Sequence, residues 1–308
     1  MFDITGKRFR FFLISGGVIL IGIISLAIFG LKAGIEFSSG SMMRVSFEQT
    51  TEPVDQGDLK QELVNLGYTN AIIQRTGETD FLIRTSELTG GDKTQLETAL
   101  TKKFGHLTET EFYSVSPMVA EETAQNAAIA VAVAAIGILL YITWAFRRMP
   151  KPFHYGTCAI IALIHDVLVV LGIFSILSGI LDWEINLMFI TGVLAVIGYS
   201  VNNTVVVFDR IRENLGMGVS PDFEVVVNNS LVETLSRSLT TSLTTLFVVL
   251  ALLFFVGASI QNFAVALLIG IIAGTYSSLF IAPQLLVVWE KGEWGRFLQW
   301  LPLRQAKA

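Results

Sequence analysis

The sequence predicts an α-helical integral membrane protein with six transmembrane helices and a small ferredoxin-like α+β domain between the first two. The first observation is compositional: 52% of the 308 residues are hydrophobic and 15% are charged, and the mean hydropathy is +0.62. Soluble domains of this length do not normally reach such values. The second observation is the recurrence of long apolar stretches, and the third is an acidic segment after the first of them whose periodicity alternates between helix and strand.

The apolar stretches are long enough to cross a bilayer. A hydrocarbon core about 30 Å thick is spanned by about 20 apolar residues in a helix. Five stretches reach this length, and they are 11–31, 123–146, 153–181, 185–208 and 238–289. The last has room for two spans, and its polar, turn-like cluster at 257–262 predicts separate helices near 238–257 and 263–289.

Six spans place both termini on the same side of the membrane. The short loops on that side and the two ends carry the basic residues Lys7, Arg8, Arg10, Arg147, Arg148, Lys151, Arg210, Arg212, Arg237, Lys291, Arg296, Arg304 and Lys307. Basic loops stay in the cytoplasm, so we expect cytoplasmic termini and an extracytoplasmic segment 32–122, in a plasma (inner) membrane or a thylakoid membrane. The first span is longer than the core of a secretory signal, which predicts an uncleaved anchor.

The predicted organisation has four parts. They are the N-terminus and first helix at 1–31, the outer domain at 32–122, a five-helix bundle at 123–289 with a cytoplasmic loop at 209–237, and a cytoplasmic tail at 290–308. Segment 32–122 carries 15 acidic and 8 basic residues, and this acidity argues against a nucleic-acid partner. The single cysteine, Cys158, lies in the third span, so no disulfide is expected in the outer domain.

The outer domain reads as strand, helix, two strands, helix and strand, at 42–48, 54–66, 71–75, 81–84, 91–104 and 109–115. This is the β-α-β-β-α-β order of the ferredoxin-like arrangement. We expect its one histidine, His106, in a solvated loop, and the domain shows no obvious catalytic residue.

Asp166 lies near the middle of the third span, beside His165. An ionised carboxylate is expensive at this depth and by default marks a proton or ion site. The alternative is a protonated carboxyl that is hydrogen-bonded between helices. Adjacent residues of a helix point about 100° apart and no further His or Cys supports ligation, so no metal site is expected.

The fourth span carries polar residues at helical spacing, among them Tyr199, Asn202, Asn203 and Thr204. Small residues permit close helix approach and amides form hydrogen bonds across a membrane interface, so structural association alone would also explain this seam. An amide such as Asn203 bonds water or a carboxyl but does not exchange a proton near neutral pH.

Two further polar segments follow. Arg237 begins the fifth span on a face that continues with Thr241; it either snorkels to the interface or reaches inward to pair with a carboxylate. The exit from the fourth span carries mixed charges that predict a short helix on the cytoplasmic face, acting either as a juxtamembrane anchor or as a hinge. These charges are Asp209, Arg210, Arg212 and Glu213.

With these residues placed, nearly the whole chain resembles the SecD/SecF family, protein-export subunits of the superfamily that includes the resistance-nodulation-division exporters. The resemblance rests on segments 34–40, 162–167, 196–214 and 234–239. It implies a SecD partner with six more spans, the Sec channel, unfolded secretory chains as cargo, and use of the proton-motive force without enzymatic activity or a cofactor. The first motif departs from the family's usual Asp-Phe-Thr-Gly-Gly, since residues 36–40 read Glu-Phe-Ser-Ser-Gly.

The main departure is at Asn203, where the family pattern has an Asp thought to carry protons. Either the Asn is natural and the proton path rests on Asp166, Arg237 and an Asp of SecD, or it is an engineered replacement that mimics the protonated Asp. Two rival functions stay open: a small-molecule exporter half, which needs a substrate pocket in the outer domain, and a non-conducting scaffold of the channel, in which Asp166 and Arg237 are dispensable.

Overall fold

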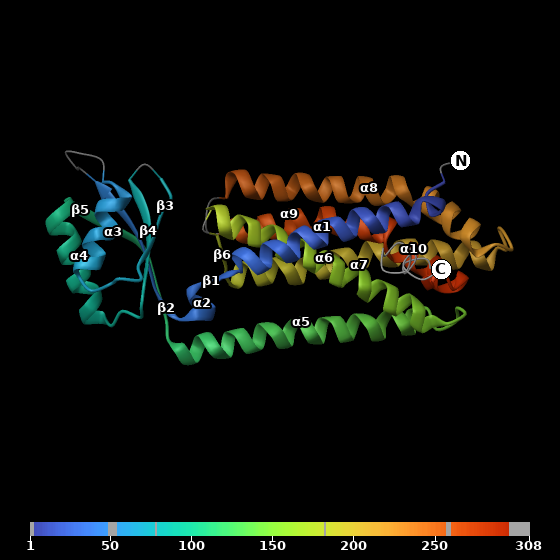
Figure 1. Ribbon diagram of the computed structural model, residues 1–308, viewed down its shortest axis with the longest axis horizontal. Coiled ribbons are helices and arrows are strands. Elements are labelled where there is room, and N and C mark those ends of the chain that lie inside the picture. Colours follow the sequence, from blue (N-terminus) through green and yellow to red (C-terminus); the bar gives the residue numbers. More distant parts are fainter. Residues whose placement is uncertain (1–2, 49–53, 78, 182, 257–259, 296–308) are drawn as a thin grey trace, which may run out of the picture. The chain divides into compact units, whose positions relative to one another are not determined.

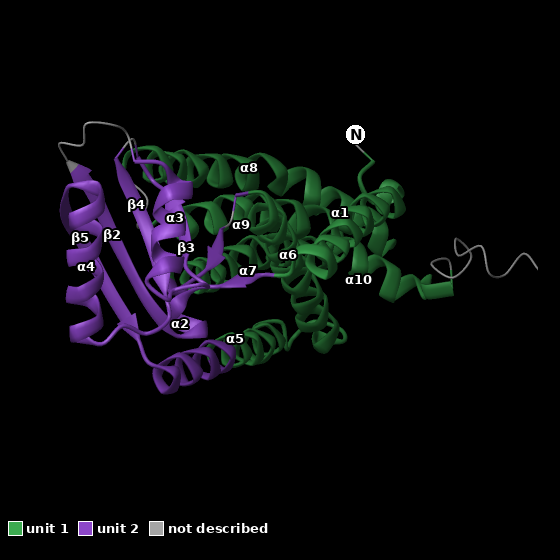
Figure 2. Ribbon diagram, turned by 60° about the vertical axis from the view of Figure 1, so that its left-hand side comes forward, with its two compact units in different colours: residues 1–30, 130–180, 188–308 green, residues 31–129, 181–187 purple. Residues whose placement is uncertain are grey.

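The computed structural model describes residues 3–48, 54–77, 79–181, 183–256 and 260–295. The chain divides into two compact units (Figure 2). Unit 1 contains residues 1–30, 130–180 and 188–308, and unit 2 contains residues 31–129 and 181–187.

Unit 1 is built from long apolar helices (Figure 1). They are α1 (Arg8–Phe29), most of α5 (Pro117–Ala145), α6 (Pro152–Leu181), α7 (Leu187–Gly216), α8 (Phe223–Phe255), α9 (Gln261–Phe280) and α10 (Ala282–Lys291), with a short 3₁₀ helix η1 (Thr5–Lys7) before α1. Six segments are long and apolar enough to cross a membrane, α9 and α10 together forming the last of them. The prediction of six transmembrane helices is therefore confirmed. The predicted break at 257–262 falls partly on residues 257–259, and the predicted tail partly on 296–308, both outside the described part of the chain.

The connection between the fourth and fifth spans is much shorter than the predicted loop 209–237. Helix α7 continues unbroken to Gly216, and α8 begins at Phe223, where the Asp222 side chain caps its N-terminus by accepting a hydrogen bond from the Glu224 N–H at 3.0 Å. The charged exit segment is thus the last part of α7 rather than a separate short helix. Ion pairs three residues apart, such as Arg210 with Glu213 at 2.5 Å, favour this continuation.

Small residues set α7 close against α9. A Cβ atom added to Gly274 would lie 2.9 Å from the Ser200 Cβ, and one added to Gly270 would lie 2.0 Å from a Val196 methyl group. Such distances are too short for ordinary packing, so only glycine permits this helix approach. The two glycines therefore let α9 pack closely on α7, which brings the polar residues of these helices together.

Unit 2 contains the predicted α+β domain. Its elements are β2 (Gly40–Glu48), α3 (Gln56–Asn65), β3 (Ile72–Arg75), β4 (Asp80–Thr85), α4 (Gly90–Phe104) and β5 (His106–Val115). The strands form an antiparallel sheet in the order β3-β4-β2-β5, with Met43 of β2 opposite Ile83 of β4 and Phe112 of β5. Two crossovers that each skip one strand give the ferredoxin-like topology, which confirms the predicted fold.

One face of this sheet is covered by α3 and α4 (Figure 1). The alternate residues Met43, Val45 and Phe47 of β2 point to that face, where they pack against the buried leucines Leu59 and Leu63 of α3 and Leu96 and Leu100 of α4. The period-2 and period-4 apolar patterns that predicted these elements are therefore the patterns that build the core. His106, expected in a loop, is instead the exposed first residue of β5, paired with Glu48.

Three short elements of unit 2 were not predicted. Strand β1 (Lys32–Ala33) pairs in parallel with β6 (Glu184–Ile185), and α2 (Ile35–Ser38) leads into β2. Between α2 and β2 the backbone turns through Ser39 at φ +62° and Gly40 at φ +127°. Elements of two to four residues show no periodicity, so the sequence pattern contains no signal for them.

Candidate functional site

Asp166 lies in the interior of unit 1, where three helices meet. Its side chain on α6 is 1% exposed. Its Oδ2 atom accepts hydrogen bonds from the Ser200 Oγ of α7 at 2.5 Å and from the Ser277 Oγ of α9 at 2.8 Å. Its Oδ1 atom lies 2.9 Å from the Nδ1 of the neighbouring His165. A buried carboxyl with three hydrogen-bonding partners is not left unsatisfied in either protonation state.

This arrangement can hold or release a proton with little rearrangement. When Asp166 is ionised, both serine hydroxyls and a protonated His165 Nδ1 can donate to it; when Asp166 is protonated, its O–H can donate to a neutral Nδ1. The two serines lie on α7 and α9, whereas Asp166 lies on α6. Small shifts of these helices would therefore change the hydrogen bonds that favour the ionised or the protonated carboxyl. The Asp166 carboxyl thus has hydrogen-bond partners in either protonation state, and its role as a proton site stays a prediction.

A second polar cluster forms around Ser242 of α8. Its Oγ lies 2.6 Å from the Thr275 Oγ1 of α9 and accepts hydrogen bonds from the Tyr199 hydroxyl at 3.0 Å and from the Asn203 Nδ2 at 3.5 Å. Asn203 is 4% exposed. Its hydrogen bond goes to Ser242 and not to Asp166.

The two clusters share helices. Ser200 and Asn203 lie three residues apart on α7, and Thr275 and Ser277 lie two residues apart on α9. Asp166 and Asn203 therefore sit in adjacent polar clusters within one bundle. Thr204 is buried but donates to the backbone carbonyl of Ser200, so it supports the helix rather than the carboxyl.

The structure does not bring two of the predicted residues to Asp166. Arg237 and Thr241 lie exposed on the outer face of α8, and the Thr241 hydroxyl donates to the Arg237 backbone carbonyl at 2.9 Å. Asn202 is likewise exposed, because adjacent residues of α7 point in different directions. Of the two alternatives for Arg237, inward pairing with a carboxylate is not found among the described residues of this chain. The seam predicted on α7 divides into a buried side and an exposed side.

The predicted hinge residues lie at the end of the bundle that also holds η1, the α7–α8 connection and the last turn of α10. There Arg210 pairs with Glu213 and with Glu233 of α8, and Arg212 pairs with Asp209. We call this the terminal end of unit 1. Buried Asn214, which sequence reasoning passed over, donates to the Ser230 Oγ at 2.9 Å and to the Glu233 Oε2 at 2.9 Å and so joins α7 to α8.

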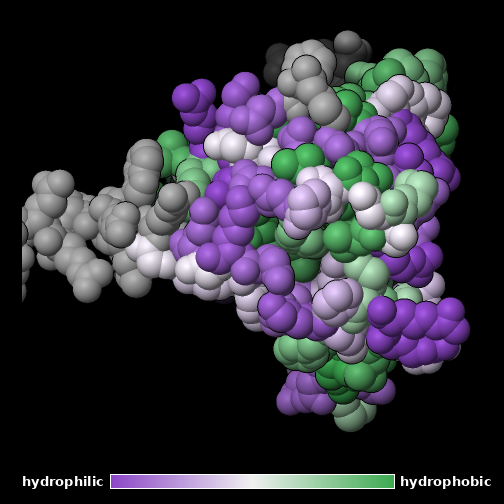
Figure 3. Space-filling model, turned by 90° about the vertical axis from the view of Figure 1, so that its right-hand side faces the viewer, coloured by the Kyte–Doolittle hydropathy of each residue, from purple (hydrophilic) through white to green (hydrophobic). Residues whose placement is uncertain are grey.

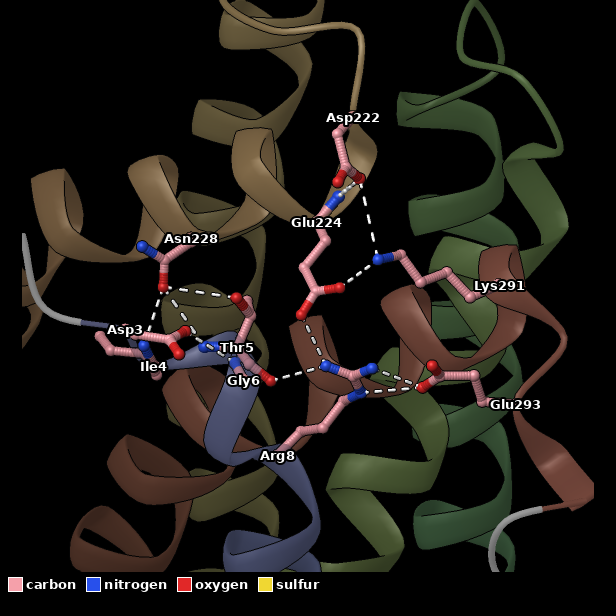
Figure 4. A network of polar contacts seen from close by, with 10 residues as sticks. All are labelled: Asp3, Ile4, Thr5, Gly6, Arg8, Asp222, Glu224, Asn228, Lys291 and Glu293. Atoms are coloured by element: carbon pink, nitrogen blue, oxygen red, sulfur yellow. Dashed lines mark hydrogen bonds and ion pairs between the residues drawn. The ribbon is translucent and has the colours of Figure 1, made fainter.

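A further ion-pair network joins three segments at the terminal end (Figure 4). The Arg8 guanidinium contacts Glu224 at the start of α8 at 2.6 Å and Glu293 beyond α10 at 2.5 Å, and Lys291 also pairs with Glu224. The Asn228 side chain accepts the backbone N–H of Ile4 at 2.8 Å. The network fixes the beginning of the chain to α8 and α10. Figure 3 looks onto this end and shows hydrophilic residues spread over much of it.

Sequence reasoning missed the serine and threonine partners of the site, which are Ser200, Ser242, Thr275 and Ser277. In the described part of the chain no group of three or more His, Cys, Asp or Glu side chains could hold a metal ion.

Comparison with known proteins assigns the family. The model of "Protein export membrane protein SecD/SecF, C-terminal" matches residues 95–292, and that of the "SecD/SecF GG Motif" matches residues 24–51. The chain belongs to the SecD/SecF family. Within that family it is 43% identical to the protein translocase subunit SecF of Thermobaculum terrenum, over 97% of both chains. It is also 43% identical to SecF of Anaerolinea thermophila, over 96% of both chains.

Solved structures of the SecD/SecF family share the fold. The crystal structure of SecDF, a translocon-associated membrane protein from Thermus thermophilus, matches with a TM-score of 0.82 and 32% identity, over 94% of this chain and 39% of that one. The SecDF subunit of Bacillus subtilis is 36% identical, over 94% of this chain and 38% of that protein. The chain thus spans about two fifths of the SecDF proteins and nearly all of the SecF proteins.

Proposed function

We propose that this SecD/SecF family member is an accessory subunit of the Sec protein-export machinery and that it works with SecD to pull unfolded secretory chains across the membrane. The proton-motive force supplies the energy, and the subunit performs no enzymatic chemistry. The observation that carries this proposal is the Asp166 carboxyl, buried among Ser200, Ser277 and His165 inside a six-span bundle. A buried ionisable group at this depth is costly and marks an ion or proton site by default.

The energetics are sufficient for a conformational cycle. A charge that crosses the membrane potential gains about 2.3 kcal/mol per 100 mV. A free-energy difference of that size biases a two-state equilibrium by more than tenfold, since 1.4 kcal/mol corresponds to a factor of about ten. Protonation of Asp166 would switch the hydrogen bonds that join α6 to α7 and α9, and the outer domain would move in response.

Two exposed faces of the bundle support a SecD partner. On α7 the small or polar residues Thr191, Ala195, Gly198 and Asn202 form an exposed stripe at helical spacing, which is the pattern of close helix association in membranes. On α8 the exposed Arg237 would be expensive in lipid, and a carboxylate on a SecD helix would neutralise it. The SecDF relatives carry more than twice the length of this chain, which supplies room for such a partner.

We place the protein in a plasma membrane, with the terminal end in the cytoplasm and the ferredoxin-like domain on the outer side. Basic residues in the short connections at the terminal end support this orientation, since such loops are retained in the cytoplasm. The Sec channel and the translocating chain would then contact the outer domain.

The test is export in vesicles that contain this chain and its cognate SecD. Asp166→Asn keeps the shape of the side chain but cannot take up a proton, and we expect it to abolish the stimulation of precursor export by a proton gradient. Ser175→Ala is the matched control, because Ser175 is a fully buried residue of the same helix that bonds Ser25 and the Gly30 carbonyl instead of Asp166. Stimulation that survives Asp166→Asn would favour the scaffold function.

A further inference from the structure

We propose that a hydrated file of hydroxyl groups between α7 and α8 carries protons from the buried polar clusters to Glu233 at the terminal end. This inference rests on the proposed function and assigns a route and a conducting residue, Ser238, to it. The residues that carry it are Ser230, Thr234, Ser238 and Ser242 on α8, with Asn203 and Asn214 on α7. We call this set the hydroxyl file.

The α8 members recur at every fourth position. All four are buried, whereas residues on the opposite face of α8, among them Arg237 and Thr241, are exposed. A spacing of four places side chains on one face of a helix, each about 6 Å above the last. One side of the file is therefore a continuous column of hydroxyls that faces the bundle interior.

The α7 members close the column at both ends. The Asn203 Nδ2 lies 3.5 Å from the Ser242 Oγ, and the Asn214 Nδ2 lies 2.9 Å from the Ser230 Oγ. Because Asn203 lies opposite Ser242 and Asn214 lies opposite Ser230, the two helices run antiparallel and these pairs fix their alignment. Eleven residues of α7 and twelve of α8 separate the two contacts, so the file is about 16–18 Å long.

Ser238, in the middle of the file, has a hydroxyl group to which the described protein groups form no hydrogen bond. Its side chain is 2% exposed, and its Oγ has no hydrogen-bond partner among the described residues. Buried hydroxyls are nearly always bonded to protein or to ordered water. Since no protein group bonds Ser238, we infer that water does.

The spacing of the column suits bridging water. Two hydroxyls about 6 Å apart are too far for a direct hydrogen bond but can both bond one water between them. The Ser230 and Thr234 hydroxyls donate to backbone carbonyls at 2.8 and 2.7 Å. A hydroxyl oxygen accepts up to two hydrogen bonds, so Thr234 can accept from such a water, and Ser230 can do so beside its bond from Asn214. Waters and hydroxyls in alternation form a chain along which a proton can move.

The two ends of the file lie near groups that can exchange protons. At the inner end Ser242 bonds Thr275, two residues along α9 from the Ser277 that donates to Asp166. At the outer end the Asn214 Nδ2 lies 2.9 Å from both the Ser230 Oγ and the Oε2 of Glu233, an exposed carboxylate. Because an amide does not exchange protons, the route passes through a water that bridges the Ser230 hydroxyl and the Glu233 carboxylate. The file therefore runs from the neighbourhood of the Asp166 carboxyl to the bulk water at the terminal end.

Hydration is tested first, by cysteine accessibility in vesicles that contain this chain and its SecD. Cys158 is replaced by alanine, so that the only thiol is the one introduced by Ser238→Cys, and a charged, membrane-impermeant methanethiosulfonate is added on the terminal side. Val207→Cys is the matched control, because Val207 is fully buried in apolar surroundings and the register places it at the depth of Ser238. We expect the Ser238 position to react several-fold faster; equal, slow reaction at both positions would overturn the hydrated file.

Conduction is tested by proton flux in the same vesicles. Ser238→Val removes the hydroxyl that bonds the water, and we expect flux to fall several-fold. Ser238→Thr has nearly the same shape as the valine variant but keeps the hydroxyl, so we expect it to retain the flux. Asp166→Asn separates the two proposals. If Asp166→Asn abolishes flux and Ser238→Val leaves it unchanged, the hydroxyl file is wrong and the proposed function stands; if Asp166→Asn leaves flux unchanged, the proposed function fails.

Discussion

The Asp166 Oδ2 atom and the Ser200 Oγ atom lie 2.5 Å apart between α6 and α7. This hydrogen bond links the only carboxyl group of the third span to the helix that also carries Asn203. On the proposed function, a change in the protonation of Asp166 would act on α7 through this bond.

Removing this hydroxyl should impair coupling without unfolding the protein. Ser200→Ala takes away one donor to the carboxyl, a loss of about 1.5–3 kcal/mol for a hydrogen bond to a charged group. We expect proton-stimulated export to fall by about one order of magnitude or more, measured in vesicles with SecD. Ser175→Ala, at a buried serine remote from Asp166, should leave export unchanged, and an equal loss in both variants would point to general destabilisation.

The turn before β2 contains a strained residue whose replacement should stabilise the outer domain. Ser39 adopts φ +62° and ψ 166°, a region that is essentially restricted to glycine. Ser39→Gly should relieve this strain and raise stability by about 1 kcal/mol, and the family motif carries glycine at this position. Hydrogen exchange of the β2 amides in the full chain measures the gain.

The neighbouring Ser38→Gly is the control for that experiment. Ser38 lies in α2, and its hydroxyl donates to the Gly34 carbonyl at 2.9 Å. Glycine there loses a hydrogen bond and adds freedom to the unfolded chain, so this substitution should destabilise. The strain argument would be contradicted by faster exchange in the Ser39→Gly protein.

Close packing of α9 on α7 should be required for the site. A Cβ at Gly274 would lie 2.9 Å from the Ser200 Cβ and 3.2 Å from its Cα, so Gly274→Ala must push the helices apart. We expect a loss of about 1–3 kcal/mol in stability and reduced proton flux, because Ser277 would move from Asp166. Gly137→Ala on α5, where nothing lies within 4 Å of the added Cβ, should leave the melting temperature in detergent unchanged or higher.

The start of α4 should show a pH-dependent stability. The Thr89 hydroxyl and backbone N–H both donate to Asp92, at 2.7 and 3.1 Å, and these hydrogen bonds lower the pKa of the Asp92 carboxyl. A group whose pKa is lowered by folding stabilises above its unfolded pKa of about 4 and loses that contribution as the pH falls through the folded value.

Asp92→Asn removes this dependence. At pH 7 the α4 amides of the wild-type protein should exchange more slowly than those of the variant, after correction for intrinsic rates. The difference should begin to shrink near pH 4 and disappear once the pH falls below the lowered pKa of Asp92 in the folded protein. Equal protection at pH 7 would mean that the capping box contributes nothing to the helix.

Much of the fold could be predicted because its signals are periodic and local. The apolar face of α4 and the alternation Met43, Val45, Phe47 each indicate one element type and one buried side, and the structure has both. The paired strands β1 and β6 could not be predicted, because two-residue strands show no pattern and come from segments far apart in sequence. The extent of α7 was underestimated because charges were taken to end a helix that they in fact continue.

Of the residues around the buried carboxyl, the sequence singled out those whose burial in a membrane has a large energetic cost. Asp166 stands out because a carboxyl in mid-membrane is costly. Ser200 and Ser277 do not, since serine and threonine in helices can also bond their own backbone, as Thr204 does. For Arg237 the sequence left snorkelling and inward pairing open, because it shows that a helix carries a cation but not which side of that helix faces the bundle.

The central claim is that protons act through Asp166, and export in cells depleted of their own SecF tests it most directly. Those cells would receive the cognate SecD with the wild-type chain, Asp166→Asn or Asn203→Asp. We predict that the wild type and Asn203→Asp restore proton-dependent precursor export and that Asp166→Asn does not, because Asn203 bonds Ser242 and not the buried Asp166 carboxyl. Full export by Asp166→Asn, or restoration by Asn203→Asp alone, would contradict this account.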